Sequence, residues 1–214
     1  MENQFDEKEL AKQLNCDKIE YNLKPTVLAN VLNNEQSLVI VVDMINGFCK
    51  VGALSSPRCK AVIEPIKNLL DKLPNAKKVF VRDCHSQNAA EFKFFPVHCA
   101  DENESALVDE LKGYNGIDLP KNSTNGFNAL LAKLPNLEFY NHFIVVGVCT
   151  DICVMQLALS LRSYLNETNL DASVITFTDC CETFDAPNHN ADLSNLFALK
   201  FMSGAGIKIF KKVI

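Results

Sequence analysis

Three uninterrupted apolar runs constrain the fold of this chain more than any other feature of its sequence. They lie within residues 37–42, 78–81 and 142–148, each after one polar first residue, and strands buried on both faces of a sheet have this character. Helical spacing of apolar residues predicts helices over Cys59–Leu73, Glu102–Lys112, Asn125–Leu134, Asp151–Tyr164 and His189–Met202. Further strands are expected over Ala172–Phe177 and Ile207–Phe210. This alternation predicts an α/β fold, a doubly wound, mostly parallel six-stranded sheet with helices on both faces.

Length, charge and cysteine usage exclude several classes of protein. The 214 residues suffice for one large domain, expected over residues 37–214, preceded by an N-terminal helical extension over residues 1–36. Short helices are expected in that extension near Glu7–Leu14 and Pro25–Leu32. The net charge of −5 and the lack of a Lys/Arg cluster argue against nucleic acid or a membrane as a partner. Nine scattered cysteines and an acidic, polar N-terminus predict a reduced, cytoplasmic protein.

Reactive side chains follow each of the three clearest predicted strands. Asp43 comes after the first strand, Asp83 to His85 after the second, and Cys149 to Cys153 after the third. In open α/β sheets, ligands bind outside the carboxyl ends of the strands. The sequence therefore predicts a ligand site of acids, a histidine and cysteines at this edge of the sheet.

Cys153 and Asp43 each allow a chemical and a structural interpretation. Cys153 lies near the start of a predicted helix, where the helix dipole lowers the pKa of a thiol and free N–H groups can stabilise an oxyanion. A buried structural cysteine is the alternative. Asp43 could take a proton from a nearby thiol and deliver it to a leaving group, or it could cap the turn after its strand.

Residues 83–98 have the composition of a metal site. Asp83 and His85 point the same way on an extended chain, and Glu91 and His98 follow in the same segment. Two imidazoles with one or two carboxylates suit zinc, iron or manganese better than magnesium or calcium. The alternative is a polar surface loop, although two of the chain's four histidines fall here. Lys121, taken alone, could be an ordinary exposed charge.

Four motifs, taken in order, resemble the cysteine hydrolases of the nicotinamidase and isochorismatase superfamily. The resemblance runs from about Leu38 to Ile209 and is nearest to the metal-dependent nicotinamidases. The motifs are VVDMINGF, RDCHSQNAAEFKFFPVH, PKNSTNGF and VVGVCTDICV. The second motif ends in an aromatic-Pro-x-His pattern, read here as Phe95-Pro96-Val97-His98.

The resemblance implies roles for particular residues of these motifs. The catalytic residues would be Asp43, Lys121 and Cys153, with Cys153 as the nucleophile and the backbone N–H groups of Cys149 and Cys153 as the oxyanion hole. One divalent ion is implied, zinc being the expected metal and iron or manganese the alternatives, with the ligands Asp83, His85, Glu91 and His98. The family pattern also implies a cis peptide between Val148 and Cys149, and a substrate pocket walled by Phe48, Phe95 and Phe127.

Hydrolysis of nicotinamide to nicotinate and ammonia is the activity that the resemblance implies. Asp43 would take the proton of Cys153, the thiolate would attack the amide carbonyl, and water would hydrolyse the resulting thioester. The expected partner is this small amide substrate, and the chain could form a homo-oligomer.

Three departures from the family pattern leave the substrate open. Ile45 stands where many nicotinamidases have Gln, Ile152 where a histidine is common, and Thr124 where an aromatic residue is frequent. Another amide or ureide hydrolase of the superfamily is therefore an alternative. A thiol redox or metal-sensing protein using Cys149 and Cys153 is a further one, but three intervening residues do not match the Cys-x-x-Cys spacing. A catalytically inactive binding protein is disfavoured by the intact set of Asp43, Lys121 and Cys153.

Overall fold

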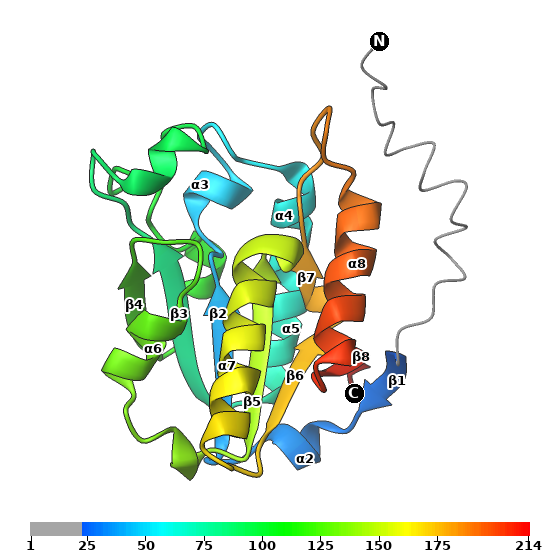
Figure 1. Cartoon of the computed structure of the whole chain (residues 1–214). Helices are drawn as coiled ribbons and strands as arrows, with labels where there is room; N and C mark the ends of the chain where they lie inside the picture. Colours follow the sequence, from blue (N-terminus) through cyan, green and yellow to red (C-terminus); the bar gives the residue numbers. More distant parts are fainter. Residues whose placement is uncertain (1–22) are drawn as a thin grey trace.

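The computed structural model describes residues 23–214, which form one parallel sheet with helices on both faces (Figure 1). The strand order is β1-β8-β6-β5-β2-β3-β4, and the short strand β7 pairs with the end of β5. Every pairing is parallel. The doubly wound α/β class predicted from the sequence is confirmed, but the sheet has eight strands rather than six. The strands are β1 (Leu23–Val27), β2 (Ser37–Val42), β3 (Lys77–Asp83), β4 (Ile117–Lys121), β5 (His142–Val148), β6 (Ser173–Phe177), β7 (Cys181–Glu182) and β8 (Lys208–Val213).

β2 and β5 form the centre of the sheet because they are continuously apolar. All of β2 is buried, and so is β5 after His142. The chain runs outward from β2 through β3 to β4, and then returns to the other side of β2 as β5. The carboxyl ends of β2 and β5 therefore adjoin at the topological switch point, where sheets of this kind bind ligands.

Helices cover the two faces of the sheet as the apolar spacing predicts. Figure 1 shows α6, α7 and α8 on one face, and α4 and α5 on the other. The helix expected over Cys59–Leu73 is divided at Val62 into α4 and α5, and α5 buries a stripe of Ile63, Ile66, Leu69 and Leu70. The α-helices are α2 (Ala29–Leu32), α3 (Asn46–Cys49), α4 (Pro57–Ala61), α5 (Ile63–Lys72), α6 (Phe127–Lys133), α7 (Met155–Glu167) and α8 (Ala191–Gly204).

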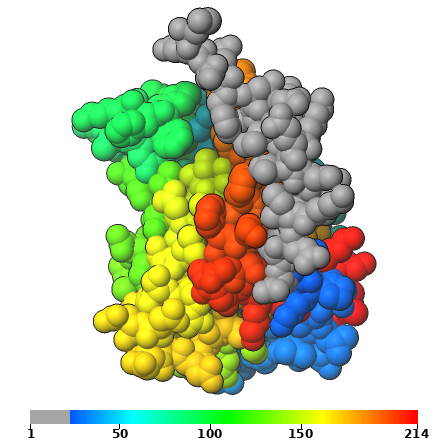
Figure 2. Space-filling model, turned by 45° about the vertical axis from the view of Figure 1, so that its right-hand side comes forward, coloured from blue at the N-terminus to red at the C-terminus, as the bar shows by residue number. Residues whose placement is uncertain are grey.

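Two expected helices differ in the structure. Of the segment Pro25–Leu32, only Ala29–Leu32 is helical, because Leu23–Val27 hydrogen bonds to β8 as the edge strand β1. The space-filling view shows β1 in blue beside β8 in red (Figure 2). The helix expected over Glu102–Lys112 is reduced to a 3₁₀ turn at Asp109–Leu111. Asp101 accepts hydrogen bonds from the Glu104 N–H and the Ser105 hydroxyl, and such local bonds compete with a helix. The segment near Glu7–Leu14 lies outside the described residues.

Strand β4 is an element that the sequence analysis did not predict. Its sequence, IDLPK, contains Pro120, which is tolerated because β4 lies at the edge of the sheet. The strand pairs with β3 in a register that sets Lys121 opposite Asp83. Lys121 thereby lies buried at the carboxyl edge of the sheet, and is not the ordinary exposed charge that it could have been on its sequence context alone.

The described residues include no helix with the length and apolar character needed to cross a membrane. The cysteines of this part of the chain are free thiols, and all of them except Cys84 are buried. Their burial agrees with the expectation that most cysteines serve as small core residues.

Gly147 is the position where a side chain would disturb the sheet most. Its φ is +123°, and a Cβ there would lie 2.0 Å from the carbonyl oxygen of Val42 in the neighbouring strand. We expect Gly147→Ala to lower the free energy of unfolding by about 3 kcal/mol, through backbone strain and overpacking. Urea denaturation would measure the loss. Gly204→Ala is the control, since nothing lies within 4 Å of that position; equal stability of the two variants would contradict the prediction.

Candidate active site

Asp43 is the first residue after β2, and backbone contacts fix its carboxylate. Its φ of 53° turns the chain away from the strand. Its N–H donates to the Val81 carbonyl at 2.8 Å, and its Oδ1 accepts from the Asp83 N–H at 2.8 Å. The side chain is completely buried. The carboxylate is therefore held in one orientation, with Oδ2 turned toward Lys121.

Lys121 joins the carboxylates of Asp43 and Asp83. Its Nζ lies 2.9 Å from Asp43 Oδ2 and also pairs with Asp83 Oδ1. The three side chains are at most 2% exposed, so water cannot replace the ammonium group as the partner of either carboxylate. One buried cation thus neutralises part of the charge of two buried anions, and the strand register of Lys121 with Asp83 determines this contact.

Cys153 completes the cluster from the other side of the switch point. It lies in the π-helical turn Thr150–Val154, between β5 and α7. Its Sγ is 3.9 Å from Lys121 Nζ, and Sγ lies within 4.8 Å of carboxylate oxygens of Asp43 and Asp83. The turn begins after Cys149, whose carbonyl accepts the N–H groups of Ile152 and Val154 at 3.1 Å. A thiol, a carboxylate and an ammonium group therefore meet at one point.

The peptide bond between Val148 and Cys149 is cis, as the resemblance implied. It joins the end of β5 to the residue from which the turn of Cys153 begins. The nucleophile candidate is consequently carried by a turn whose starting geometry is set by the central strand.

Burial determines the protonation states of the cluster. Burial, reinforced by the charge of Asp83, raises the pKa of Asp43 to about 6, although Lys121 opposes the shift. Burial also raises the pKa of the Cys153 thiol well above its ordinary value, in spite of Lys121. This desolvation outweighs the lowering that a helix start was expected to cause. Cys153 therefore rests as a thiol and needs a neighbouring base for its activation.

The two other ionised groups keep their charges. Burial alone would lower the pKa of Lys121, but the charges of Asp43, Cys153 and Asp83 raise it well above the usual value. Burial would raise the pKa of Asp83, but the charge of Lys121 holds it well below its usual range. An ammonium and a carboxylate thus flank the Cys153–Asp43 pair.

Asp83, His85 and His98 form a buried group of potential metal ligands next to this cluster. Asp83 Oδ2 lies 3.5 Å from His85 Nε2 and 3.8 Å from His98 Nε2. Glu91 Oε2 lies 3.8 Å from His85 Nε2. The His85 Nε2 and Glu91 Oε2 atoms are buried without hydrogen-bond partners. Unpaired buried polar atoms are costly, and a cation held among nitrogen and carboxylate ligands would satisfy them, so the residues fit a divalent ion of the zinc, iron or manganese type.

Aromatic rings surround the two imidazoles. The ring centroids of Phe48 and Phe95 lie 5.9 and 6.2 Å from that of His98. Phe127 contacts a different ring, that of Tyr164 in α7, with 5.6 Å between the two centroids. Phe92, which the sequence motifs did not single out, forms edge-to-face pairs with His85 and His98, with centroid distances of 5.5 and 5.7 Å. Its place directly after Glu91 in the sequence was the available signal.

Apolar side chains occupy two of the positions that depart from the family pattern, one near Asp43 in the sequence and one near Cys153. Ile45 is completely buried two residues after Asp43, and Ile152 packs partly buried against the core just before Cys153. Thr124, the third departure, donates its N–H to Glu91 Oε1 at 2.7 Å. The first two departures place hydrocarbon where polar groups are common. Thr124 instead stays polar, and its hydroxyl donates to Gln156 Oε1 at 3.3 Å.

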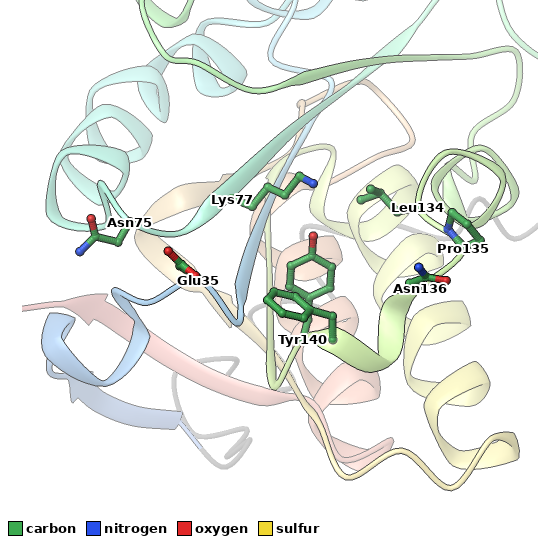
Figure 3. A pocket seen from close by; sticks show the side chains of 8 residues that line it. Glu35, Asn75, Lys77, Leu134, Pro135, Asn136 and Tyr140 are labelled. Atoms are coloured by element: carbon green, nitrogen blue, oxygen red, sulfur yellow. The ribbon is translucent and has the colours of Figure 1, made fainter.

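A separate cavity of about 540 Å³ lies at the opposite edge of the sheet (Figure 3). It is found where β2 and β3 begin, far along the strands from the carboxyl ends that carry the reactive residues. None of the reactive residues of the catalytic cluster or of the potential metal site lines it; its lining consists of Glu35, Asn75, Lys77, Leu134, Pro135, Asn136, Phe139 and Tyr140. The chemistry of the chain is therefore concentrated at the switch point and not in this cavity.

Comparison with known proteins gives consistent similarities. Residues 37–205 match the isochorismatase domain. Nicotinamidase 1 of Arabidopsis thaliana is 26% identical over 219 residues, which cover 86% of this chain and 89% of that protein. The pyrazinamidase of Pyrococcus horikoshii in complex with zinc superposes with a TM-score of 0.66 at 24% identity, covering 80% of this chain and 97% of the other. PnC1 from L. infantum in complex with nicotinate gives 0.70 at 21% identity, covering 90% and 99%. The two structural likenesses establish the fold.

Lys121 is expected to support the stability of the folded chain as well as its site. Lys121→Met leaves two buried carboxylates facing each other without a cation, and breaking a buried ion pair in this way costs about 3–5 kcal/mol. Lys112→Met, which removes an exposed pair with Asp109, should cost less than about 1 kcal/mol. Urea denaturation with a chelator present would compare the two.

The sign of the pH dependence is a second part of the same test. Without Lys121 the folded pKa of Asp43 should rise further above its unfolded value, so the folded chain binds a proton more readily as the pH falls. The destabilisation by Lys121→Met should therefore be smaller at pH 5 than at pH 7. A loss that is equal at both pH values, or equal to that of Lys112→Met, would show that the ion pair is not important.

Proposed function

This chain belongs to the isochorismatase family of hydrolases, and we propose that it is a metal-containing nicotinamidase, which converts nicotinamide to nicotinate and ammonia. The observation that carries the proposal is that the side chains of Asp43, Lys121 and Cys153 lie together in a buried cluster. Beside this cluster, the potential ligand atoms His85 Nε2 and Glu91 Oε2 have no hydrogen-bond partner. The similarity to the Arabidopsis nicotinamidase and the likeness to a structure with bound nicotinate support the substrate class.

In the first half of the proposed reaction, Asp43 removes the proton of Cys153 and the thiolate attacks the amide carbonyl. A carboxyl group whose pKa burial raises to about 6 suits this exchange, because it can both accept and release a proton near neutral pH. Lys121 remains an ammonium group and stabilises the thiolate at 3.9 Å. The backbone N–H groups of Cys149 and Cys153 are proposed to bind the carbonyl oxygen as it becomes negative.

In the second half, the tetrahedral adduct collapses to a thioester. Asp43 gives its proton to the amide nitrogen, so that ammonia leaves with the electron pair of the C–N bond. A water molecule then attacks the thioester and loses its proton to Asp43, which returns it to the departing Cys153 sulfur. Nicotinate is released and the thiol is restored, so the same carboxyl group serves first as base and then as acid, both in forming the thioester and in hydrolysing it.

The ligand set proposed for a divalent ion is Asp83, His85, His98 and Glu91. Such an ion would act as a Lewis acid, able to bind a pyridine nitrogen and a water molecule. The chain's own contribution is to orient the ring: Phe48, Phe92 and Phe95 lie around the two imidazoles and offer apolar surfaces to a flat heterocycle. Phe127, which packs against Tyr164, remains only a predicted member of the pocket.

A second candidate is another amide or ureide hydrolase of the same family. Ile45 and Ile152 favour it, because they are apolar where polar side chains are common in nicotinamidases, two residues after Asp43 and directly before Cys153. The reaction at Cys153 would be the same for both candidates, and only the acyl group would differ.

The substrate is tested by measuring ammonia release from nicotinamide, pyrazinamide and carbamoyl compounds, with metal analysis on the same preparation. We expect nicotinamide to be turned over with equimolar formation of nicotinate and ammonia, and a divalent ion to be present in equimolar amount with the chain. If metal-loaded protein hydrolyses a carbamoyl compound but not nicotinamide, this result would contradict the nicotinamidase proposal and favour the other amide or ureide hydrolase.

The nucleophile is tested by comparing the two cysteines of the VVGVCTDICV motif. Cys153→Ala should abolish hydrolysis, because no thioester can form, whereas Cys149→Ala should largely preserve it, because only the Cys149 N–H is proposed to act. Steady-state kinetics with nicotinamide would measure both. Equal loss in the two variants, together with a Cys149–Cys153 disulfide detected by mass spectrometry, would instead support a redox function.

A further inference from the structure

We propose that Asn122 is a positioning residue that fixes the orientation and tautomer of His85 as a metal ligand. The inference rests on the metal site of the function proposed above and adds a residue outside that ligand set. Asn122 directly follows Lys121 at the end of β4. Its side-chain oxygen contacts residues 85 and 86 of the segment 83–98, called here the metal loop because it carries the proposed ligands, and it does not contact the catalytic cluster.

The backbone of Ser86 determines which atom of the Asn122 amide faces this loop. The Ser86 N–H lies 3.2 Å from the amide, and because an N–H can only donate, the facing atom must be the oxygen Oδ1. The same Oδ1 lies 3.3 Å from His85 Nδ1. An amide oxygen can only accept, so His85 must carry a hydrogen on Nδ1. The two contacts together therefore assign the His85 tautomer.

With the hydrogen on Nδ1, the lone pair of neutral His85 is on Nε2, and this atom faces the proposed metal position. It lies 3.5 Å from Asp83 Oδ2 and 3.8 Å from Glu91 Oε2, distances too long for a hydrogen bond. It is buried and has no hydrogen-bond partner among the described residues. A lone pair surrounded by carboxylate oxygens at these distances suits a cation placed between them.

Asn122 belongs to a short segment that holds three of the proposed ligands in turn. Lys121 pairs with Asp83, Asn122 accepts from His85, and the Thr124 N–H donates to Glu91 Oε1 at 2.7 Å. His98 differs, since its Nδ1 lies 2.8 Å from the Pro96 carbonyl within the metal loop itself. Outer contacts of this kind set the ring orientation and raise the basicity of the ligand nitrogen.

The experiment compares metal affinity in Asn122→Ala, Asn122→Asp and the wild type, using Co²⁺ and Zn²⁺ in competition with a chromogenic chelator. Asn122→Ala removes the acceptor and should weaken binding about 10–100-fold, the usual effect of losing an outer contact. Asn122→Asp keeps an oxygen for both donors and should bind almost as tightly as the wild type. The Co²⁺ absorption spectrum of Asn122→Ala should also change, because the His85 ring is no longer held.

Ser123→Ala is the matched control, since Ser123 is the next residue, is exposed, and donates only to the Asn125 carbonyl. Asn122 is also exposed, so its replacements should leave the metal-free melting temperature nearly unchanged. Wild-type affinity in Asn122→Ala, or equal weakening in Ser123→Ala, would overturn the inference. A wild type that binds neither ion would overturn it together with the metal site, whereas a wild type that binds metal without hydrolysing nicotinamide would contradict only the proposed substrate.

Discussion

The buried contact of Lys121 with Asp43 and Asp83 is the interaction on which the rest of the site depends. Two carboxylates at the ends of adjacent strands would repel each other strongly in a region without water. The ammonium group between them allows both to remain buried, one beside a thiol and the other beside two imidazoles. The Lys121 ammonium group therefore serves both the proposed acid-base pair and the proposed metal site. Without it, the two carboxylates would face each other without a compensating charge.

Strand β4 supplies that cation, and the residues after it support the metal loop. The parallel register of β3 and β4 puts Lys121 opposite Asp83, and the chain then passes Asn122 and the Thr124 N–H along the loop that follows β3. Loops that carry functional groups need a rigid scaffold to position them. Here the edge strand β4 and the residues that follow it hold three of the proposed metal ligands, namely Asp83, His85 and Glu91.

The apolar environment of the cluster explains how its groups can serve opposite roles. Burial raises the pKa of Asp43 and of Cys153 together, so each group binds a proton more readily than it would in water. Ile45 and Ile152 add hydrocarbon close to this pair in the sequence. They leave the reacting groups themselves unchanged.

The sequence by itself determined the class of fold and the residues that meet at the switch point. Continuous apolar runs over β2 and β5 require burial on both faces, and a chain of alternating strands and helices has few other ways to provide it. The motif order also picked out Asp43, Lys121 and Cys153, which the structure brings together. Only the tertiary structure decided the strand β4, the extra edge strand β1, and the places of Phe92, Asn122 and Phe127. Those depend on strand register and on contacts between segments far apart in the chain, and a local pattern carries no information about which distant partner will satisfy a side chain.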